Sequence, residues 1–314
     1  GAIYSADMEK LAETVILEDG KEYRNYPYEN LFAHAVGFST KGKTGIEAQA
    51  NSYLINSNIS LSDKIDNEIA GVKNPGDNVY TSLRTDLQKI ASKSLGVYKG
   101  AVIVSNVKTG EILAMVSKPD FNPCTIVEDW DRYLEDEDSS VLLNRATQGI
   151  YPPGSTFKIL TAAAALDAGV TTPEDSFYCS AKIKVDGDTI RCWGNPHKDE
   201  TMAEALQNSC NPVFVELALR LGTQRMYQYL HAFGLGSKTN VDLQGEGSGI
   251  LIPVQKVKNV DLARIGFGQS VAVTPIQLLT AACAVINGGR LMQPYLLKEA
   301  LSPDGTVLYR TQPK

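Results

Sequence analysis

The chain has 314 residues, of which 43% are hydrophobic and 21% are charged, a composition typical of globular domains. It excludes collagen-like, disordered and coiled-coil proteins, and at ~150 residues per domain the length predicts about two domains. The 36 acidic residues outnumber the 30 Lys and Arg residues for a net charge of −6, which argues against a nucleic-acid partner held through phosphate contacts.

Short strands and turns are predicted at the start of the chain. Residues 11–17 and 21–28 have the pattern of two strands joined by the turn Glu18-Asp19-Gly20, and a polar helix follows. A cluster of Pro, Gly and Asn at residues 73–78 then indicates a boundary. We therefore expect one folding unit over residues 1–75 and a second from residue 76 onward.

The second unit is predicted to open with an amphipathic helix and a hairpin. Apolar residues recur at helical spacing from Leu83 to Leu95. Two apolar runs at residues 101–104 and 112–116 follow, with a turn at Lys108-Thr109-Gly110 between them. A hairpin of this kind needs further strands beside it.

Most of the remaining chain is predicted to be helical. After an acidic run at Glu135 to Asp138, interpreted as a solvated loop, an Ala-rich helix follows the turn at residues 152–154. A hairpin from Cys179 to Cys192 interrupts the helices. The uncharged run from Ile265 to Gly289 is long enough to cross a bilayer, but its Gly, Pro, Gln and Asn residues favour a buried helix at about Pro275 to Ile286.

Ser155 and Lys158 form an S-x-x-K pair at the predicted start of the Ala-rich helix. Three-residue spacing puts both side chains on one helix face, and the helix N-terminus supplies free N–H groups and the positive end of its dipole. A lysine made neutral by burial can accept the serine proton, and the N–H groups can stabilise an oxyanion. Because S-x-x-K also arises by chance, the alternative is a capping serine beside a solvated lysine.

Ser209-Cys210-Asn211 forms an S-x-N element after a helix that begins with the capping box Thr201 to Glu204. Serine acyltransferases of the penicillin-recognising kind use S-x-N to relay protons and to hold the substrate amide beside an S-x-x-K serine. The two motifs in this order predict a catalytic site of Ser155, Lys158, Ser209 and Asn211.

Four segments resemble class B penicillin-binding proteins, the monofunctional peptidoglycan D,D-transpeptidases, and occur in the same order. They are residues 110–117, 142–158, 206–211 and 267–277. The resemblance runs from about residue 76 onward, and the segment from Tyr26 to Glu47 is similar to the end of the family's N-terminal pedestal. Among relatives, the septal and spore-cortex type is the most similar.

This resemblance implies a mixed α/β (α+β) fold, in which an antiparallel sheet is flanked by helices and accompanied by an all-helical subdomain. A small β-rich N-terminal pedestal precedes that domain. Residues 1–75 are then part of the non-catalytic pedestal, and residues 76–314 form the transpeptidase domain. The resemblance also implies an enzyme on the extracytoplasmic face of the cell membrane, with an N-terminal anchor absent from this sequence.

By the same resemblance, Ser155 attacks the D-Ala-D-Ala bond of a peptidoglycan stem peptide, expels the terminal D-Ala and passes the acyl group to an amine of a neighbouring strand. Lys158 is then the general base, and Ser209 and Asn211 relay protons and contact substrate. The implied partners are stem peptides on lipid-linked or nascent glycan strands, β-lactams that acylate the same serine, and other cell-wall synthesis proteins. The chemistry implies no metal and no organic cofactor.

The family's third motif, a K-T-G on a strand edge after S-x-N, does not occur there. Lys43-Thr44-Gly45 and Lys108-Thr109-Gly110 both precede Ser155, so neither is expected to be catalytic. The simplest hypothesis is that this sequence stops before the K-T-G strand.

Three of the five cysteines lie near the predicted site. Cys179 and Cys192 flank the predicted hairpin, Cys210 lies inside S-x-N, and His197 falls between them. In an extracytoplasmic protein a Cys192–Cys210 or Cys179–Cys192 disulfide is one interpretation, and reduced, packed thiols are another. A zinc site of these four residues is a third, although no C-x-x-C pair supports it.

Two other functions share parts of this pattern. A serine β-lactamase has the same fold and S-x-x-K but hydrolyses its acyl-enzyme with a positioned water. The separate N-terminal unit counts against it, and Glu204, the only nearby match to a deacylation glutamate, precedes S-x-N and is better explained as a capping residue. A non-catalytic β-lactam sensor or scaffold is the other alternative, against which the intact serine, lysine and asparagine argue.

Overall fold

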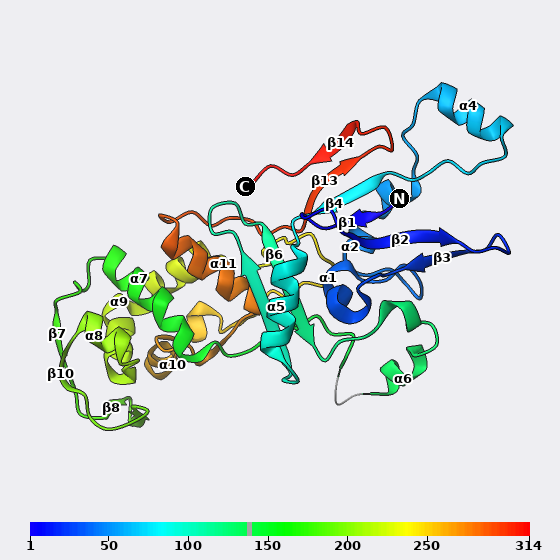
Figure 1. Ribbon diagram of the computed structural model, residues 1–314. Helices are drawn as coiled ribbons and strands as arrows, with labels where there is room; N and C mark the ends of the chain where they lie inside the picture. Colours follow the sequence, from blue (N-terminus) through cyan, green and yellow to red (C-terminus); the bar gives the residue numbers. More distant parts are fainter. Residues whose placement is uncertain (137–139) are drawn as a thin grey trace. The chain divides into compact units, whose positions relative to one another are not determined.

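The computed structural model describes residues 1–136 and 140–314, so the predicted acidic loop at Glu135 to Asp138 lies partly outside the described residues. The chain forms two compact units (Figure 1). Unit 1 consists of residues 1–148, 240–246 and 292–314, and unit 2 of residues 149–239 and 247–291. The units therefore do not divide at residue 75, and the expected pedestal boundary stays a prediction.

A six-stranded sheet is the centre of unit 1. Its strands lie in the order β14 (Val307–Arg310), β13 (Leu297–Leu301), β4 (Asn78–Thr81), β1 (Ile3–Tyr4), β2 (Lys10–Ile16) and β3 (Glu22–Asn25). The pair β1–β4 is parallel and the other neighbours are antiparallel. The predicted hairpin near residue 20 is confirmed as β2–β3, whereas the long-range pairing of β13 with β4 has no local sequence signal.

Short helices lie between the strands of this sheet along the chain of unit 1. They are η1 (Glu29–Phe32), α1 (Ala33–Val36), α2 (Gly45–Gln49), α3 (Asn51–Ile55), α4 (Leu61–Ile69), η2 (Pro123–Thr125) and α6 (Trp130–Glu135).

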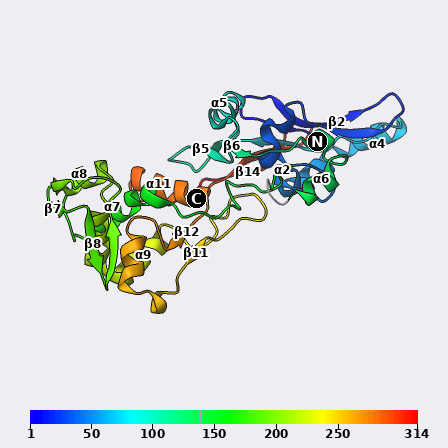
Figure 2. The ribbon, with the colours of Figure 1, turned by 90° about the horizontal axis from the view of Figure 1, so that it is seen from below.

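Helix α5 (Thr85–Leu95) and the hairpin of β5 (Gly100–Ser105) and β6 (Ile112–Lys118) form where they were predicted, and the helix packs against the hairpin (Figure 2). The expectation of further strands was wrong for the described residues, in which β5 and β6 form a two-stranded sheet. The contact between helix and hairpin is apolar, and Ala91 of α5 forms one buried cluster with Ala114 and Val116 of β6. The Gln88 amide also donates to Met115 O at 2.7 Å and accepts from Met115 N at 2.9 Å. These paired hydrogen bonds replace a strand neighbour for part of the β6 backbone.

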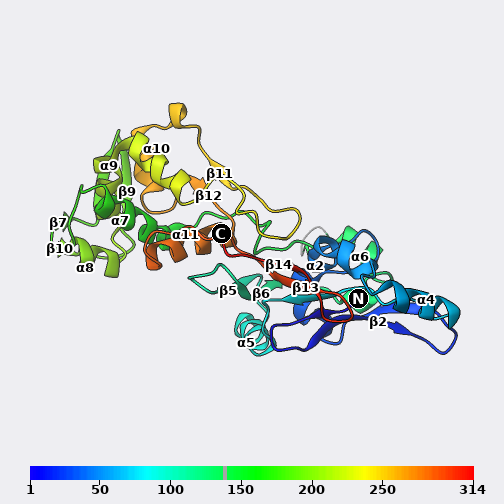
Figure 3. The same cartoon turned by 90° about the horizontal axis from the view of Figure 1, so that it is seen from above.

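Unit 2 is mainly helical, with short strands paired beside the helices (Figure 3). Its helices are η3 (Gly154–Phe157), α7 (Lys158–Asp167), α8 (Met202–Gln207), α9 (Asn211–Ala232), η4 (Val254–Lys256), α10 (Asn259–Ile265) and α11 (Pro275–Ile286). The strand pairs are β7 (Ser176–Cys179) with β10 (Lys198–Thr201), β8 (Lys182–Val185) with β9 (Asp188–Arg191), and β11 (Ile250–Leu251) with β12 (Val271–Ala272).

The core of unit 2 forms where α7, α9 and α10 meet. Phe157, Leu160, Phe214 and Leu217 are at most 2% exposed in this core. Helix α11 matches the predicted helix at Pro275 to Ile286, and within the described part of the chain no helix is long and apolar enough to span a membrane. The fold as a whole is mixed α/β.

Candidate active site

Ser155 lies in η3, the single 3-10 turn before α7, and Lys158 is the first residue of α7. The sequence predicted both on one α-helix; instead the chain enters α7 through a tighter turn after Gly154, whose φ is 58°. Gly154 N donates to Gly268 O at 2.9 Å. A Cβ atom at Gly268 would lie 2.1 Å from Gly154 O, so glycine there allows the close approach that supports the Ser155 turn.

The Lys158 amine connects the two predicted motifs. Its Nζ lies 3.3 Å from Ser155 Oγ, 2.9 Å from Ser209 Oγ, 2.7 Å from Asn211 Oδ1 and 2.6 Å from Ser209 O. Lys158 is 1% exposed, whereas Ser155 is exposed. The structure thus brings all four predicted site residues together, with the serine open to solvent and the amine buried beneath it.

Burial lowers the pKa of Lys158 to about 8, and the nearby Cys192 and Cys210 act weakly in the opposite direction. The ring of Phe214, whose centroid lies 5.6 Å from Nζ, forms part of the apolar surroundings. Desolvation disfavours the ammonium form, so a sizeable share of Lys158 is neutral near pH 8. A neutral amine within reach of a serine hydroxyl can act as a general base.

The S-x-N element lies between two helices. Helix α8 ends at Gln207, Ser209 adopts a φ of 53°, and buried Cys210 caps α9. A left-handed serine is strained, and it turns the side chain and carbonyl of Ser209 toward Lys158. Asn211 Nδ2 donates to Arg191 O at 3.0 Å, which orients the amide so that Oδ1 accepts from Lys158.

The two K-T-G triplets have local structural roles in unit 1. Residues 108–110 form the turn between β5 and β6, as predicted. Thr44 precedes α2 and Gly45 begins it, with φ at 58° and Val36 backbone atoms 2.6 Å from where a Cβ would lie. Glu204, the other ambiguous residue, is confirmed as a capping residue, since its carboxylate accepts from Thr201 N at 2.7 Å.

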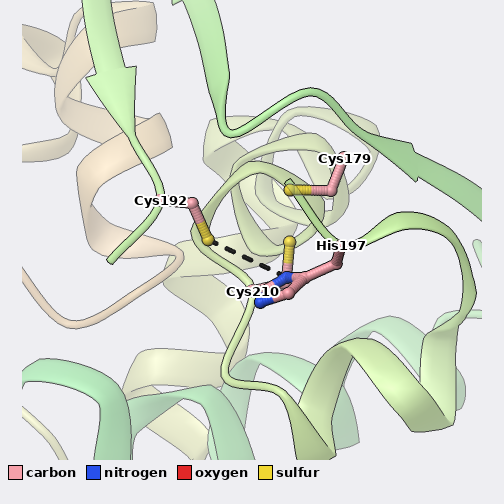
Figure 4. A group of neighbouring side chains, drawn as sticks. All are labelled: Cys179, Cys192, His197 and Cys210. Atoms are coloured by element: carbon pink, nitrogen blue, oxygen red, sulfur yellow. Dashed lines mark hydrogen bonds between the residues drawn. The ribbon is translucent and has the colours of Figure 1, made fainter. Parts of the chain in front are cut away.

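The side chains of Cys179, Cys192, His197 and Cys210, for which the sequence offered three interpretations, lie together in unit 2 (Figure 4). Cys179 ends β7, Cys192 follows β9, His197 precedes β10, and Cys210 caps α9. Strand pairing accounts for two of the four, because Lys198 in β10 is opposite Cys179 in β7 and therefore places His197 beside Cys179. None of the five cysteines, all of which lie among the described residues, forms a disulfide. The sequence offered a zinc site of these four residues as one interpretation, but their spacing contains no metal motif that would favour zinc over a disulfide or packed thiols.

Comparison with known proteins covers both parts of the sequence. The family profile "Penicillin binding protein transpeptidase domain" matches residues 100–314, and the profile "Penicillin binding protein A dimerisation domain" matches residues 1–79. Stage V sporulation protein D of Bacillus subtilis is 38% identical over 301 residues, covering 89% of this chain and 46% of that protein. Peptidoglycan D,D-transpeptidase PbpA of Mycolicibacterium smegmatis is 31% identical over 322 residues, covering 93% of this chain and 63% of that protein.

Among solved structures, penicillin-binding protein A from M. tuberculosis in an imipenem acyl-enzyme complex superposes with a TM-score of 0.90 at 30% identity. The superposition covers 100% of this chain and 76% of that chain. The D,D-transpeptidase domain of a peptidoglycan glycosyltransferase from Eggerthella lenta gives a TM-score of 0.89 at 27% identity. The chain spans about half the length of the curated relatives it matches, from 46% of the Bacillus subtilis protein to 63% of the Mycolicibacterium smegmatis PbpA.

Proposed function

Because this chain belongs to the penicillin-binding protein transpeptidase family, as a class B member, we propose that it carries the acylation site of a peptidoglycan D,D-transpeptidase. One observation carries the proposal: a single buried amine, Lys158 Nζ, contacts Ser155 Oγ, Ser209 Oγ and Asn211 Oδ1. Solved relatives with acyl-enzymes of imipenem, ceftriaxone and penicillin G support a covalent serine mechanism for the same fold.

In the proposed acylation step, neutral Lys158 takes the proton of Ser155 as Oγ attacks the carbonyl carbon of the D-Ala-D-Ala bond. Backbone N–H groups of the η3 turn are available to stabilise the oxyanion that forms. When the intermediate collapses, the C–N bond breaks and the proton passes from Lys158, through Ser209 Oγ, to the departing D-Ala amine. Ser155 is then bound to the stem peptide as an ester.

In the second step an amine of a neighbouring stem peptide attacks this ester. Lys158 receives the proton of the attacking amine and returns a proton to Ser155 Oγ as the C–O bond breaks. The product is a new amide cross-link, and the enzyme returns to its starting state. Asn211 contacts the substrate amide, while Arg191 O holds its side chain in position.

The setting of the reaction is also part of the proposal. The named relatives act in cell-wall synthesis, so we place this protein at the extracytoplasmic face of the cell membrane, held by an N-terminal anchor. Its partners are then stem peptides on lipid-linked or nascent strands and other proteins of the cell-wall machinery. Residues 1–75 serve as part of the non-catalytic pedestal, in agreement with the dimerisation-domain match to residues 1–79.

The test is the intact mass of the protein after incubation with excess benzylpenicillin. We expect a stoichiometric adduct that persists for an hour and is absent from Ser155→Ala. Thr156→Ser is the matched control, since Thr156 is exposed beside Ser155 and its hydroxyl bonds only to Pro153 O among the described contacts. Consumption of penicillin without a lasting adduct would indicate a β-lactamase, and neither adduct nor consumption would indicate a scaffold.

A further inference from the structure

The cluster of Cys179, Cys192, His197 and Cys210 has the spacing of a metal site. One donor atom from each residue lies within 4.8 Å of the other three, and Cys192 Sγ is 4.0 Å from His197 Nδ1. On a tetrahedral zinc ion with Zn–S at ~2.3 Å and Zn–N at ~2.0 Å, neighbouring donor atoms lie ~3.5–3.8 Å apart. Small side-chain rotations therefore suffice to bring the four donors onto one ion.

The chemistry of these donors selects the metal. Three thiolates and one imidazole form a soft, four-coordinate set, which suits Zn²⁺ and does not suit Mg²⁺ or Ca²⁺, whose preferred ligands are oxygens. Cys179 and Cys210 are fully buried, while Cys192 and His197 are partly exposed. The buried pair protects the ion, and the exposed pair gives it a path from solvent.

A buried carboxylate beside the cluster supports a cation there. Glu200 is 4% exposed, and its Oε1 has no hydrogen-bond partner among the described residues. That oxygen lies 3.6 Å from His197 Nδ1, while Oε2 accepts from Asn208 Nδ2 at 3.0 Å. Carboxylates beside the ligating side chains are a common part of zinc sites, where they orient the ligands.

We propose that Cys179, Cys192, His197 and Cys210 bind a structural Zn²⁺ ion that positions the S-x-N element. The ion would join the end of β7, the segment between β9 and β10, and the N-cap of α9. Cys210 lies between Ser209 and Asn211, both of which contact Lys158 Nζ. Four protein ligands leave no open coordination position, so the ion orders the segment and takes no part in acyl transfer.

The metal site stands on its own geometry, and only its positioning effect depends on the proposed function. The experiment therefore measures metal first. Protein purified under reducing conditions is analysed for zinc by elemental mass spectrometry, stripped with a chelator and titrated with Co²⁺. We expect one zinc per chain, and with Co²⁺ we expect thiolate-to-cobalt charge-transfer bands together with the intense d–d bands of a tetrahedral site.

Substitutions separate these ligands from the other thiols. Cys192→Ser, at the most accessible of the three cysteine ligands, should lose the metal and the charge-transfer bands. Cys283→Ser is the matched control, because Cys283 is a partly buried cysteine on α11, in no disulfide and outside the cluster, and it should keep both signals. If circular dichroism shows that Cys192→Ser is unfolded, the zinc content and the cobalt spectrum of the wild-type protein still test whether the site binds a metal.

Two outcomes would overturn the proposal. One is a folded, fully reduced wild-type protein that takes up neither Zn²⁺ nor Co²⁺ at one equivalent. The other is a protein whose mass under denaturing, non-reducing conditions is two hydrogens lower with two of these cysteines joined, since that disulfide would replace the metal. Neither depends on penicillin acylation, so failure of the zinc site and failure of the proposed function are separate results.

Discussion

Lys158 Nζ lies closer to the backbone oxygen of Ser209, at 2.6 Å, than to the hydroxyl of Ser155, at 3.3 Å. Ser209 O and Asn211 Oδ1 are oxygens that can only accept hydrogen bonds. A neutral lysine has two N–H groups and one lone pair, so these two acceptors can hold both N–H groups. The lone pair then remains for a serine hydroxyl, which is the arrangement that a general base requires.

The first prediction concerns pH. Burial holds the pKa of Lys158 at about 8, well below the usual range of lysine. Because the neutral amine is the active form, the second-order rate of acylation by benzylpenicillin should rise about tenfold per pH unit below pH 8 and level off above it. Stopped-flow or mass measurements across this range test it. A rate that is flat with pH would show that Lys158 does not accept the proton in the rate-limiting step.

Replacement of the lysine is the second prediction. Lys158→Met keeps the length and apolar packing of the side chain but removes the base, so acylation should fall by ~10²–10⁴-fold. Lys182→Met, at an exposed lysine of β8 in the same unit, should leave the rate unchanged. A Lys158→Met protein that acylates at the wild-type rate would assign the base to another group.

Asn211 provides the third prediction, because its amide bonds to both Lys158 and Arg191 O. Asn211→Ala removes both hydrogen bonds, and at ~1 kcal/mol each this should slow acylation ~10–100-fold. Asn211→Asp places a carboxylate beside Nζ, which should raise the pKa of Lys158 and move the pH profile to higher pH.

The shift of the profile separates an electrostatic effect from general structural damage to α9. Asn259→Ala, at an exposed asparagine that begins α10, is the matched control and should leave rate and profile unchanged. If Asn211→Asp only lowers the rate without moving the profile, Asn211 does not act through Lys158.

A pair of glycines gives the fourth prediction. Gly268 and Gly288 both have positive φ, at 80° and 87°, so alanine at either costs ~1–3 kcal/mol of backbone strain. Only at Gly268 does the added Cβ meet backbone, at 2.1 Å from Gly154 O, whereas nothing lies within 4 Å at Gly288. Gly268→Ala should therefore lose acylation and melt at a lower temperature than Gly288→Ala. Equal acylation in the two variants would show that the Ser155 turn does not depend on this contact.

Local sequence signals predicted the elements that depend on local structure. The helices α5 and α11, the β2–β3 and β5–β6 hairpins and the capping box of α8 lie within a few residues of their predicted positions. The turn before α7 was the exception. S-x-x-K was expected on an α-helix, but Ser155 lies in a 3-10 turn. The tertiary contact of Gly154 with Gly268 that supports this turn is invisible in a local pattern.

The four site residues were predicted because motif order and type carry chemical information without knowledge of distance. The cluster around Cys210 could not be selected in the same way. The register of β7 with β10 places His197 beside Cys179, and a one-residue change of register would turn His197 to the opposite face, while Cys192 and Cys210 reach the cluster from the end of β9 and the start of α9. The sequence therefore named the four residues of the cluster but could not rank metal binding above a disulfide or reduced thiols.

The sheet of unit 1 has a consequence for the order of folding. Strand β4 pairs with β1, which is made early, and with β13, which is made only after the whole of unit 2. During synthesis the β13 side of β4 is therefore an open edge while residues 149–291 emerge. We expect unit 2 to fold as an insertion before that edge is covered, so a chaperone that protects exposed strands would act on the nascent chain at this stage.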